Sequence, residues 1–292
     1  MKQAILITAY KNMHHLEELA AFFDDSFELY IHIDKKSGIS KKELESLKKY
    51  DVVKLVSQKY KVNWGGFNHL KSILFLTEQA LKNSKNFYLH LISGHDFPIK
   101  PKQFFLEFFK KKNTEFISYF EVPRIGWADN NGMDRLEYFN LYDVFDAKKS
   151  KHNKWIKRLI SLQKKYGYKR SIPSSFPQLY GGATWWSLTR ECAEYVIEYT
   201  NENKSFFNRF KHTLCSEEFY FQTIIMNSRF AENVSTNTLR YIDWNSRNGN
   251  RPAVLDELDY EKLTLTDAVF ARKFEYPISE DIMKKLRALN VG

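Results

Sequence analysis

The stretch "LHLISGHDFPIKP" (residues 89–101) decides the fold class of this chain. It begins as a run of mostly apolar residues, which is typical of a strand covered on both faces, and ends abruptly in Ser93-Gly94-His95-Asp96. Pro98 and Pro101 then prevent the strand from continuing. Because ligands of open α/β sheets lie beyond the carboxyl ends of the strands, this ending indicates a binding edge.

The segments before this stretch alternate between strand-like and helix-like patterns. The clearest helix places Leu70, Ile73, Leu74 and Leu81 on one face. The alternation predicts an α/β fold with a mostly parallel, Rossmann-like sheet flanked by helices. The predicted strands are 3–10, 27–34, 52–57 and 87–93, and the predicted helices are 12–23, 41–50 and 68–83.

Two other predicted strands also end in polar residues, at Thr8-Ala9-Tyr10 and at His32-Ile33-Asp34. Because the carboxyl ends of parallel strands meet at one edge of a sheet, we expect these ends to lie beside Ser93–Asp96. Residues 121–180 carry turn signals and many aromatic and basic residues, so we interpret them as an irregular acceptor or lid surface. Residues 179–200 predict a Gly-Gly turn, a short strand and a helix.

The net charge of the chain limits the classes of partner that we expect. The chain has 292 residues, with 45 Lys+Arg against 35 Asp+Glu and a formal net charge of +10. This charge suits phosphate-bearing ligands, acidic polymers and anionic membranes. No helix-turn-helix, zinc-finger or RNA-binding pattern is present, so we expect no nucleic-acid partner.

Several common ligand motifs are missing from the sequence. There is no G-x-x-x-x-G-K-[ST] loop and no G-x-G-x-x-G after a strand, which argues against a P-loop ATPase and a Rossmann dehydrogenase. There is no Asp-x-Asp, and the histidines lack a third ligand, so we expect no metal and no cofactor. A diphosphate would then need side-chain cations, for which Arg251 and the pair Arg272-Lys273 are candidates.

Cysteine use and hydropathy bear on the compartment. Cys192 and Cys215 form no C-x-x-C pair, which favours a reducing compartment. The first residues resemble no signal peptide, and no segment reaches the roughly 18 apolar residues of a membrane span. We expect a cytoplasmic protein that can touch the inner face of a cell membrane through a basic surface.

The segment "CSEEFYFQTI" (215–224) places two carboxylates just before an apolar helix, predicted over 217–227. One reading is an ordinary helix start, with Ser216 as N-cap and glutamates in the first turn. The other is a general base held beside a cleft. The pattern alone leaves both open.

Six segments, in order along most of the chain, resemble the core-2/I-branching β-1,6-N-acetylglucosaminyltransferase family, which also contains the peptide O-xylosyltransferases. The most specific is the opening stretch, which is similar to the family's Ser/Cys-Gly-x-Asp-Phe-Pro-Ile/Leu-Lys signature. The six are "YIHIDKKS" (30–37), "VNWGGFNHLKSILFLTEQAL" (62–81), "YLHLISGHDFPIK" (88–100), "YGGATWWSLTRECAEYVI" (180–197), "SEEFYFQTII" (216–225) and "FARKFE" (270–275).

The resemblance implies a GT-A type fold, a UDP-sugar donor and an inverting, metal-independent transfer to a glycan or glycolipid hydroxyl. It implies one domain over 1–292, with a nucleotide-sugar half (1–120) and an acceptor and catalytic half (121–292). The family's catalytic glutamate falls on Glu218. The implied donor-binding residues are Asp34, Val62, Asn63, Ser93, Gly94, His95, Asp96, Arg251 and Lys273. The candidate acceptor-binding residues are Glu121, Trp127, Arg135, Glu217, Tyr241 and Trp244.

The mammalian members carry a membrane anchor, a stem and many disulfides, none of which is present in this sequence. We therefore expect a bacterial member that builds surface polysaccharide, with N-acetylglucosamine as the transferred sugar. Two alternatives stay open. In the first alternative, the enzyme uses UDP-xylose, UDP-galactose or UDP-glucuronate as its donor. In the second, the chain is a non-catalytic protein that binds acidic glycans or anionic surfaces.

Overall fold

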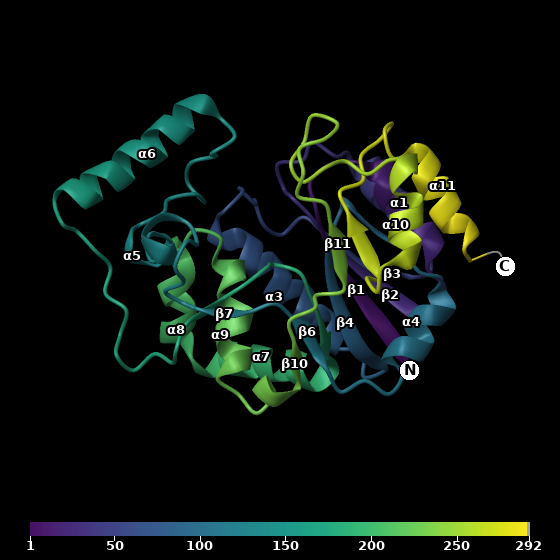
Figure 1. Cartoon of the computed structure of the whole chain (residues 1–292), viewed down its shortest axis with the longest axis horizontal. Coiled ribbons are helices and arrows are strands. Elements are labelled where there is room, and N and C mark those ends of the chain that lie inside the picture. Colours follow the sequence, from purple (N-terminus) through teal and green to yellow (C-terminus); the bar gives the residue numbers. More distant parts are fainter. Residues whose placement is uncertain (291–292) are drawn as a thin grey trace.

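The computed structural model describes residues 1–290 and is built around one mixed sheet of seven strands (Figure 1). The strand order is β10-β6-β9-β4-β1-β2-β3, and β9 alone runs antiparallel to its neighbours. The strands are β1 (Lys2–Ala9), β2 (Phe27–Ile33), β3 (Val53–Ser57), β4 (Asn86–Ser93), β6 (Glu115–Ile117), β9 (Trp186–Thr189) and β10 (Val234–Ser235). This confirms the predicted α/β class with a mostly parallel sheet.

The strands inside the sheet are buried on both faces, which explains why β1 and β4 read as mostly apolar runs. In β1, Ile5 and Ile7 belong to one hydrophobic core, while Ala4 and Leu6 belong to the core on the opposite face. The same alternation recurs in β4. Side chains from one strand therefore hold helices on both sides of the sheet.

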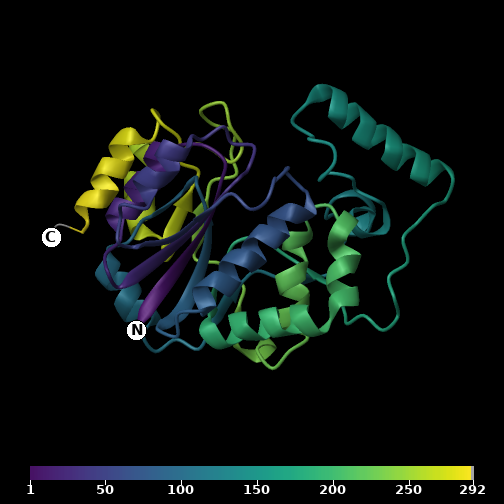
Figure 2. The ribbon, with the colours of Figure 1, turned by 180° about the vertical axis from the view of Figure 1, so that it is seen from behind.

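Helices cover the two faces in two groups (Figure 1, Figure 2). The first core includes side chains of α1 (Met13–Phe22), α2 (Lys41–Leu47), α4 (Lys102–Phe109), α10 (Tyr260–Leu265) and α11 (Glu280–Ala288). The second core includes side chains of α3 (Phe67–Leu81), α7 (Arg190–Glu202), α8 (Lys204–Arg209) and α9 (Tyr220–Met226). Strands β9 and β10 come from the second half of the chain, so both halves share one sheet.

A smaller sheet places the C-terminal segments beyond the end of β4. It has the order β11-β12-β5, with β11 (Arg240–Ile242) parallel to β12 (Phe270–Arg272) and β12 antiparallel to β5 (Asp96–Pro98). Arg272 pairs with Asp96 in this register. The turn after β4 is thus the point where the opening stretch leaves one sheet and joins another. A separate antiparallel pair is formed by β7 (Phe120–Glu121) and β8 (Tyr180–Gly181).

Two predictions need correction. Ser216 does not cap the predicted helix, because the chain first makes a 3-10 turn over Ser216–Glu218 and α9 begins only at Tyr220. Cys215, with φ of 51°, bends the chain into that turn, and the Ser216 hydroxyl is buried without a partner. Both glutamates therefore lie in a tight turn ahead of the helix.

The segment expected to be irregular contains a long helix. The region 121–180 includes a 3-10 turn (Asp129–Gly132), α5 (Asp134–Glu137) and α6 (Ser150–Lys165). Figure 1 shows α6 standing out from the body at the end opposite α11. Within residues 1–290, no helix combines the length and the apolar character needed to cross a bilayer.

Candidate active site

The polar ends of three strands lie side by side, as the sequence predicted. Thr8 at the end of β1 is in register with His32 of β2 and with Ser93 of β4. The amide of Gly94 donates to the carbonyl of Thr8 at 2.9 Å, and the amide of Asp34 donates to the carbonyl of Ala9 at 2.8 Å. We call this row of strand ends the strand edge.

Asp34, Val62 and Asn63, the first predicted donor residues, form one cluster at the strand edge. Asp34 Oδ1 accepts hydrogen bonds from the backbone amides of Val62 (2.9 Å) and Lys36 (3.0 Å). The Lys36 ammonium donates to the Asn63 side chain, whose amide group donates to the Tyr142 carbonyl at 2.6 Å. Asp34 therefore fixes the loop that begins at Val62.

The turn Ser93–Asp96 is held rigidly by its own side chains. Asp96 is buried, accepts a hydrogen bond from the Ser93 amide and lies 3.4 Å from Arg272 Nε. A Cβ added at Gly94 would lie only 2.8 Å from the Ala9 Cβ. Glycine is needed at this position because β1 packs against the turn, and the Asp96 carboxylate serves to fix the loop.

A carboxylate at the C-terminal side holds two lysines together. Glu275 accepts from Lys273 Nζ at 2.7 Å and from Lys11 Nζ at 2.8 Å, and it lies 3.8 Å from His95 Nδ1. Burial by itself would raise the pKa of Glu275, but the hydrogen bonds from Lys11 and Lys273 lower it to about 2. Burial lowers the pKa of His95 to about 3, so its imidazole is neutral near pH 7.

Lys11 was not among the predicted residues. Its signal in the sequence is its place directly after the polar end of β1, but only the fold shows that Glu275, far away in the chain, faces it. Lys273 Nζ also lies 3.1 Å from Asn250 Oδ1. Arg251, the neighbour of Asn250, is exposed and donates through Nε to the Trp244 carbonyl at 3.1 Å. The two predicted diphosphate cations thus come from adjacent segments.

The glutamate turn carries an ion pair. Glu218 Oε2 lies 2.8 Å from Arg135 Nη1, and the Glu218 side chain keeps 27% exposure. Burial raises the pKa of Glu218 and the nearby Glu217 carboxylate raises it further, although Arg135 opposes both effects. A carboxylate of increased basicity that remains partly open to solvent meets the requirements for a general base.

Three predicted acceptor residues lie at Glu218, namely Glu217 in the same turn, Arg135 and Trp127. The guanidinium of Arg135 lies over the Trp127 ring at 4.7 Å and over the Phe219 ring at 5.5 Å. The other predicted acceptor residues are divided among separate places. Glu121 is exposed on β7, and Tyr241 and Trp244 belong to β11 and its following loop, the segment that carries Arg251.

His69 connects the glutamate turn to the strand edge. Its Nδ1 lies 2.9 Å from Glu217 Oε1, and its Nε2 lies 3.4 Å from Thr8 Oγ1. His69 stands in the first turn of α3. Sequence reasoning missed it because a lone histidine in a helix carries no motif. Its contacts make Glu217 and Glu218 neighbours of the strand edge.

The glycine loop before α3 supports both sides of this arrangement. The carbonyl of Gly65 accepts from the Cys215 amide at 3.0 Å, just ahead of the glutamate turn. Gly65 has φ of 76°, and a Cβ there would lie 2.5 Å from Leu214. The loop that begins at Val62, whose amide donates to Asp34, therefore contacts at Gly65 the segment that positions Glu218.

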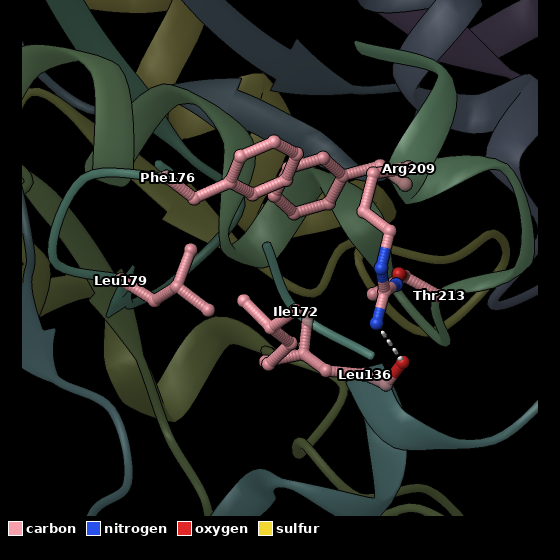
Figure 3. Close-up of a pocket in the computed structure, with 7 residues that line it drawn as sticks. Leu136, Ile172, Phe176, Leu179, Arg209 and Thr213 are labelled. Carbon is pink, nitrogen blue, oxygen red and sulfur yellow. Dashed lines mark hydrogen bonds between the residues drawn. The ribbon is translucent and has the colours of Figure 1, made fainter. Parts of the chain in front are cut away.

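A small cavity lies under the segment that carries Arg135 (Figure 3). Its volume is about 10 Å³, enough for one water molecule at most. Figure 3 shows the Arg209 guanidinium beside it, donating to the Leu136 carbonyl at 3.0 Å. This cavity is a packing gap among side chains next to the segment that carries Arg135.

A second hollow, of about 230 Å³, lies between α1 and α2. It is lined by Glu17, Ser46, Lys49 and Tyr50, so none of the predicted donor, acceptor or catalytic residues lines it.

Among residues 1–290, no three His, Cys, Asp or Glu side chains gather in a way that could hold a metal ion. Metal independence stays a prediction, which activity in the presence of a chelator would test.

Comparison with known proteins finds similarity to glycosyltransferases, both among solved structures and among curated proteins. Similar solved structures include the galactosyltransferase LgtC, determined with donor and acceptor sugar analogues, at a TM-score of 0.42, 8% identity, and coverage of 99% of this chain and 97% of LgtC. The bifunctional glycosyltransferase WbbM gives a TM-score of 0.39 and 12% identity over 98% of this chain and 50% of WbbM.

The chain belongs to the Core-2/I-Branching enzyme family, whose model matches residues 4–267. Similar proteins include Xylosyltransferase 2 of Canis lupus familiaris, 25% identical over 92% of this chain and 31% of the relative. Xylosyltransferase 1 of Mus musculus is 25% identical over 91% of this chain and 28% of the relative. This chain therefore spans less than a third of the length of these two curated relatives.

Proposed function

We propose that this chain is an inverting, metal-independent glycosyltransferase that moves a sugar from a UDP-sugar to a hydroxyl of a glycan or glycolipid. The observation that carries the proposal is the placement of Glu218. Its carboxylate, paired with Arg135, is linked through Glu217 and His69 to the strand edge. The lysine pair held by Glu275 lies near the same strand ends, because Lys11 stands two residues after the end of β1.

The reaction is a single displacement. The acceptor oxygen attacks the anomeric carbon as the bond from that carbon to the UDP oxygen breaks, and Glu218 takes the acceptor proton. The ion pair with Arg135 uses Oε2, which leaves Oε1 as the oxygen to receive the proton. Arg135 holds the carboxylate in one orientation against Trp127 and lowers the free energy of its ionised form.

The leaving UDP gains negative charge, which needs cations in place beforehand. Lys273 and Lys11 are held by one carboxylate, and Arg251 lies in the neighbouring loop. We propose that these three side chains meet the diphosphate in place of a metal ion. Asp34, Val62, Asn63 and the turn Ser93–Asp96 form the nucleoside and sugar side of the same edge.

The identity of the donor stays a proposal. N-acetylglucosamine follows from the family resemblance, whereas the similarity to xylosyltransferases favours UDP-xylose as the second candidate. UDP-galactose and UDP-glucuronate are the remaining candidate donors. Synthesis of a bacterial surface polysaccharide in the cytoplasm, with peripheral contact to an anionic membrane, remains a prediction supported by the net charge of +10.

The test compares wild type with Glu218→Gln in EDTA-containing buffer, with UDP release from UDP-sugars as the readout and calorimetric UDP binding beside it. Loss of a general base lowers the rate by about 10²–10⁴-fold, while UDP binding stays within about twofold. The matched control is Glu78→Gln, an exposed glutamate on α3 outside the site. If Glu218→Gln and Glu78→Gln both bound UDP and released it from UDP-sugars at equal rates, Glu218 would not be the general base. No UDP binding at all would favour the non-catalytic binding protein.

A further inference from the structure

The net charge of the chain is concentrated in one segment. Residues 148–170 contain ten Lys or Arg and no Asp or Glu, which equals the whole excess of +10. The rest of the chain is electrically neutral on the same formal count. Most of the segment is α6, and Ile156 is the one residue of that helix that is buried.

The exposed side of α6 combines apolar and basic groups. Trp155, Leu162 and Tyr166 lie seven and four residues apart, which places them on one side of the helix. Their exposed fractions are 43%, 40% and 75%. The Arg158 guanidinium lies 5.5 Å from the Trp155 ring, and Lys165 follows Leu162 by three residues, so cations border the apolar row. We call this surface the α6 outer face.

The side of α6 that flanks the apolar row attaches the helix to the body. The Asp146 amide donates to His152 Nδ1 at 3.1 Å, and Gln163 accepts from the Phe139 amide at 2.8 Å. Within residues 1–290, ion pairs bind two of the ten basic groups to carboxylates, namely Lys164 and Lys169. The helix is therefore held along the side that carries His152, Ile156 and Gln163, and α6 as a whole stands apart from the sheet (Figure 1, Figure 2).

The two ends of the segment are anchored at the candidate site. Before α6, Asp146 lies 3.2 Å from Lys36 Nζ, and the Lys148 ammonium lies 4.2 Å from the Tyr10 ring. After α6, the Arg170 guanidinium donates to the Leu136 carbonyl, next to Arg135, and Arg209 also donates to that carbonyl (Figure 3). A surface that bound to α6 would thus lie near both the strand edge and the glutamate turn.

We infer that the α6 outer face binds the surface of an anionic lipid bilayer. An aromatic and aliphatic row bordered by Lys and Arg is the composition of helices that lie in the membrane interface, where the apolar row enters the headgroup boundary. The basic groups are attracted to anionic lipids, and this attraction extends about one Debye length from the surface. The inference assigns the peripheral contact of the proposed function to particular residues. The inference depends on the proposed transferase function in one respect only, namely that the enzyme reaches its acceptor at the membrane.

The test is co-sedimentation of the full chain with vesicles of phosphatidylcholine alone or with one third phosphatidylglycerol. We expect binding to the anionic vesicles only, weakened by salt. Trp155→Ser/Leu162→Ser and Arg158→Glu/Lys165→Glu should each lower the vesicle partition coefficient at least about tenfold, since both apolar contact and charge contribute. Lys41→Glu/Lys42→Glu, which makes the same charge change at exposed positions of α2, should change it less than about twofold.

Calorimetric binding of UDP is measured on every variant to show that each is folded, and it separates this inference from the transferase proposal. Loss of vesicle binding with retained UDP binding supports the α6 outer face. Absence of binding to anionic vesicles, or equal losses in the α2 and α6 charge variants, overturns it. So does a dimer of the free chain that Trp155→Ser/Leu162→Ser dissociates, because a second copy would then cover this face. Tighter binding to a single-stranded oligonucleotide than to vesicles would also overturn it.

Discussion

Arg135 and Glu218 form an ion pair of 2.8 Å between Nη1 and Oε2 at the rim of the strand edge. The pair orients a carboxylate whose pKa burial raises, and it keeps that carboxylate ionised. The guanidinium also lies over the rings of Trp127 and Phe219. The function proposed for Glu218 therefore depends on the balance between burial, which makes it a stronger base, and Arg135, which keeps it deprotonated.

The acidic limb of the pH–rate profile tests this balance. Since Glu218 acts as a base, activity is lost as pH falls through its pKa. Burial raises that pKa, so the limb in kcat/KM should lie above the ordinary glutamate value of about 4.3. Replacing Arg135 with Gln removes the opposing charge, and the limb should move to still higher pH. Arg135→Lys keeps the charge and should shift it less. A limb that does not move in Arg135→Gln would assign it to another group.

The lysine pair makes a prediction about diphosphate binding. Lys11→Ala and Lys273→Ala should each weaken UDP binding by about 10–100-fold, because each removes a charge-assisted hydrogen bond of about 1.5–3 kcal/mol. Binding of uridine, which has no phosphate, should change little, and Lys41→Ala on the exposed side of α2 is the control. Calorimetry with UDP and uridine measures this. Equal losses for the two ligands would mean that the lysines support the nucleoside side instead.

Gly94→Ala should destabilise the fold. The new methyl group would lie 2.8 Å from the Ala9 Cβ inside a closely packed edge, and overpacking of this kind costs about 1–3 kcal/mol. The free energy of unfolding from urea titration is the measurement. The double variant Ala9→Gly/Gly94→Ala should recover part of the loss. Full stability of Gly94→Ala would contradict the packing role assigned to this glycine.

His69→Ala should leave the buried Glu217 carboxylate without its partner. We expect about 1–3 kcal/mol of lost stability, and a lower kcat because the turn that carries Glu218 is no longer tied to Thr8. His69→Ala/Glu217→Gln removes the unpaired charge and should restore stability more than kcat. If both variants kept wild-type kcat at saturating donor, His69 would not position the catalytic turn.

The strand edge could be predicted from the sequence because its cause is local. Buried parallel strands read as apolar runs, and their polar ends at Thr8, Asp34 and Ser93 show where the sheet stops. Glu218 could be predicted for the same reason, because the family motif that contains it is a short continuous segment. Contacts between residues far apart in the sequence were not accessible, as with Lys11 and Glu275 or His69 and Glu217.

The helix α6 was missed for a different reason. Its sequence has almost no buried face, and Ile156 is the one residue of the helix that is buried. The turn signals and the many aromatic and basic residues of 121–180 therefore indicated an irregular acceptor or lid surface. The reading of Ser216 as N-cap, one of the two left open, does not hold, and the helix predicted from 217 begins only at Tyr220. An N-cap motif and a 3-10 turn share the same polar residues, and the left-handed conformation of Cys215 decides between them.

The most direct measurement is calorimetric binding of UDP to the wild-type chain in EDTA, followed by UDP release from a panel of UDP-sugars under the same conditions. The account predicts that UDP binds without a metal ion and that one donor is hydrolysed in preference to the others. UDP binding or release that is absent in EDTA and returns with Mn²⁺ would contradict the metal-independent mechanism. Absence of UDP binding under either condition would contradict the assignment of this chain as a UDP-sugar transferase.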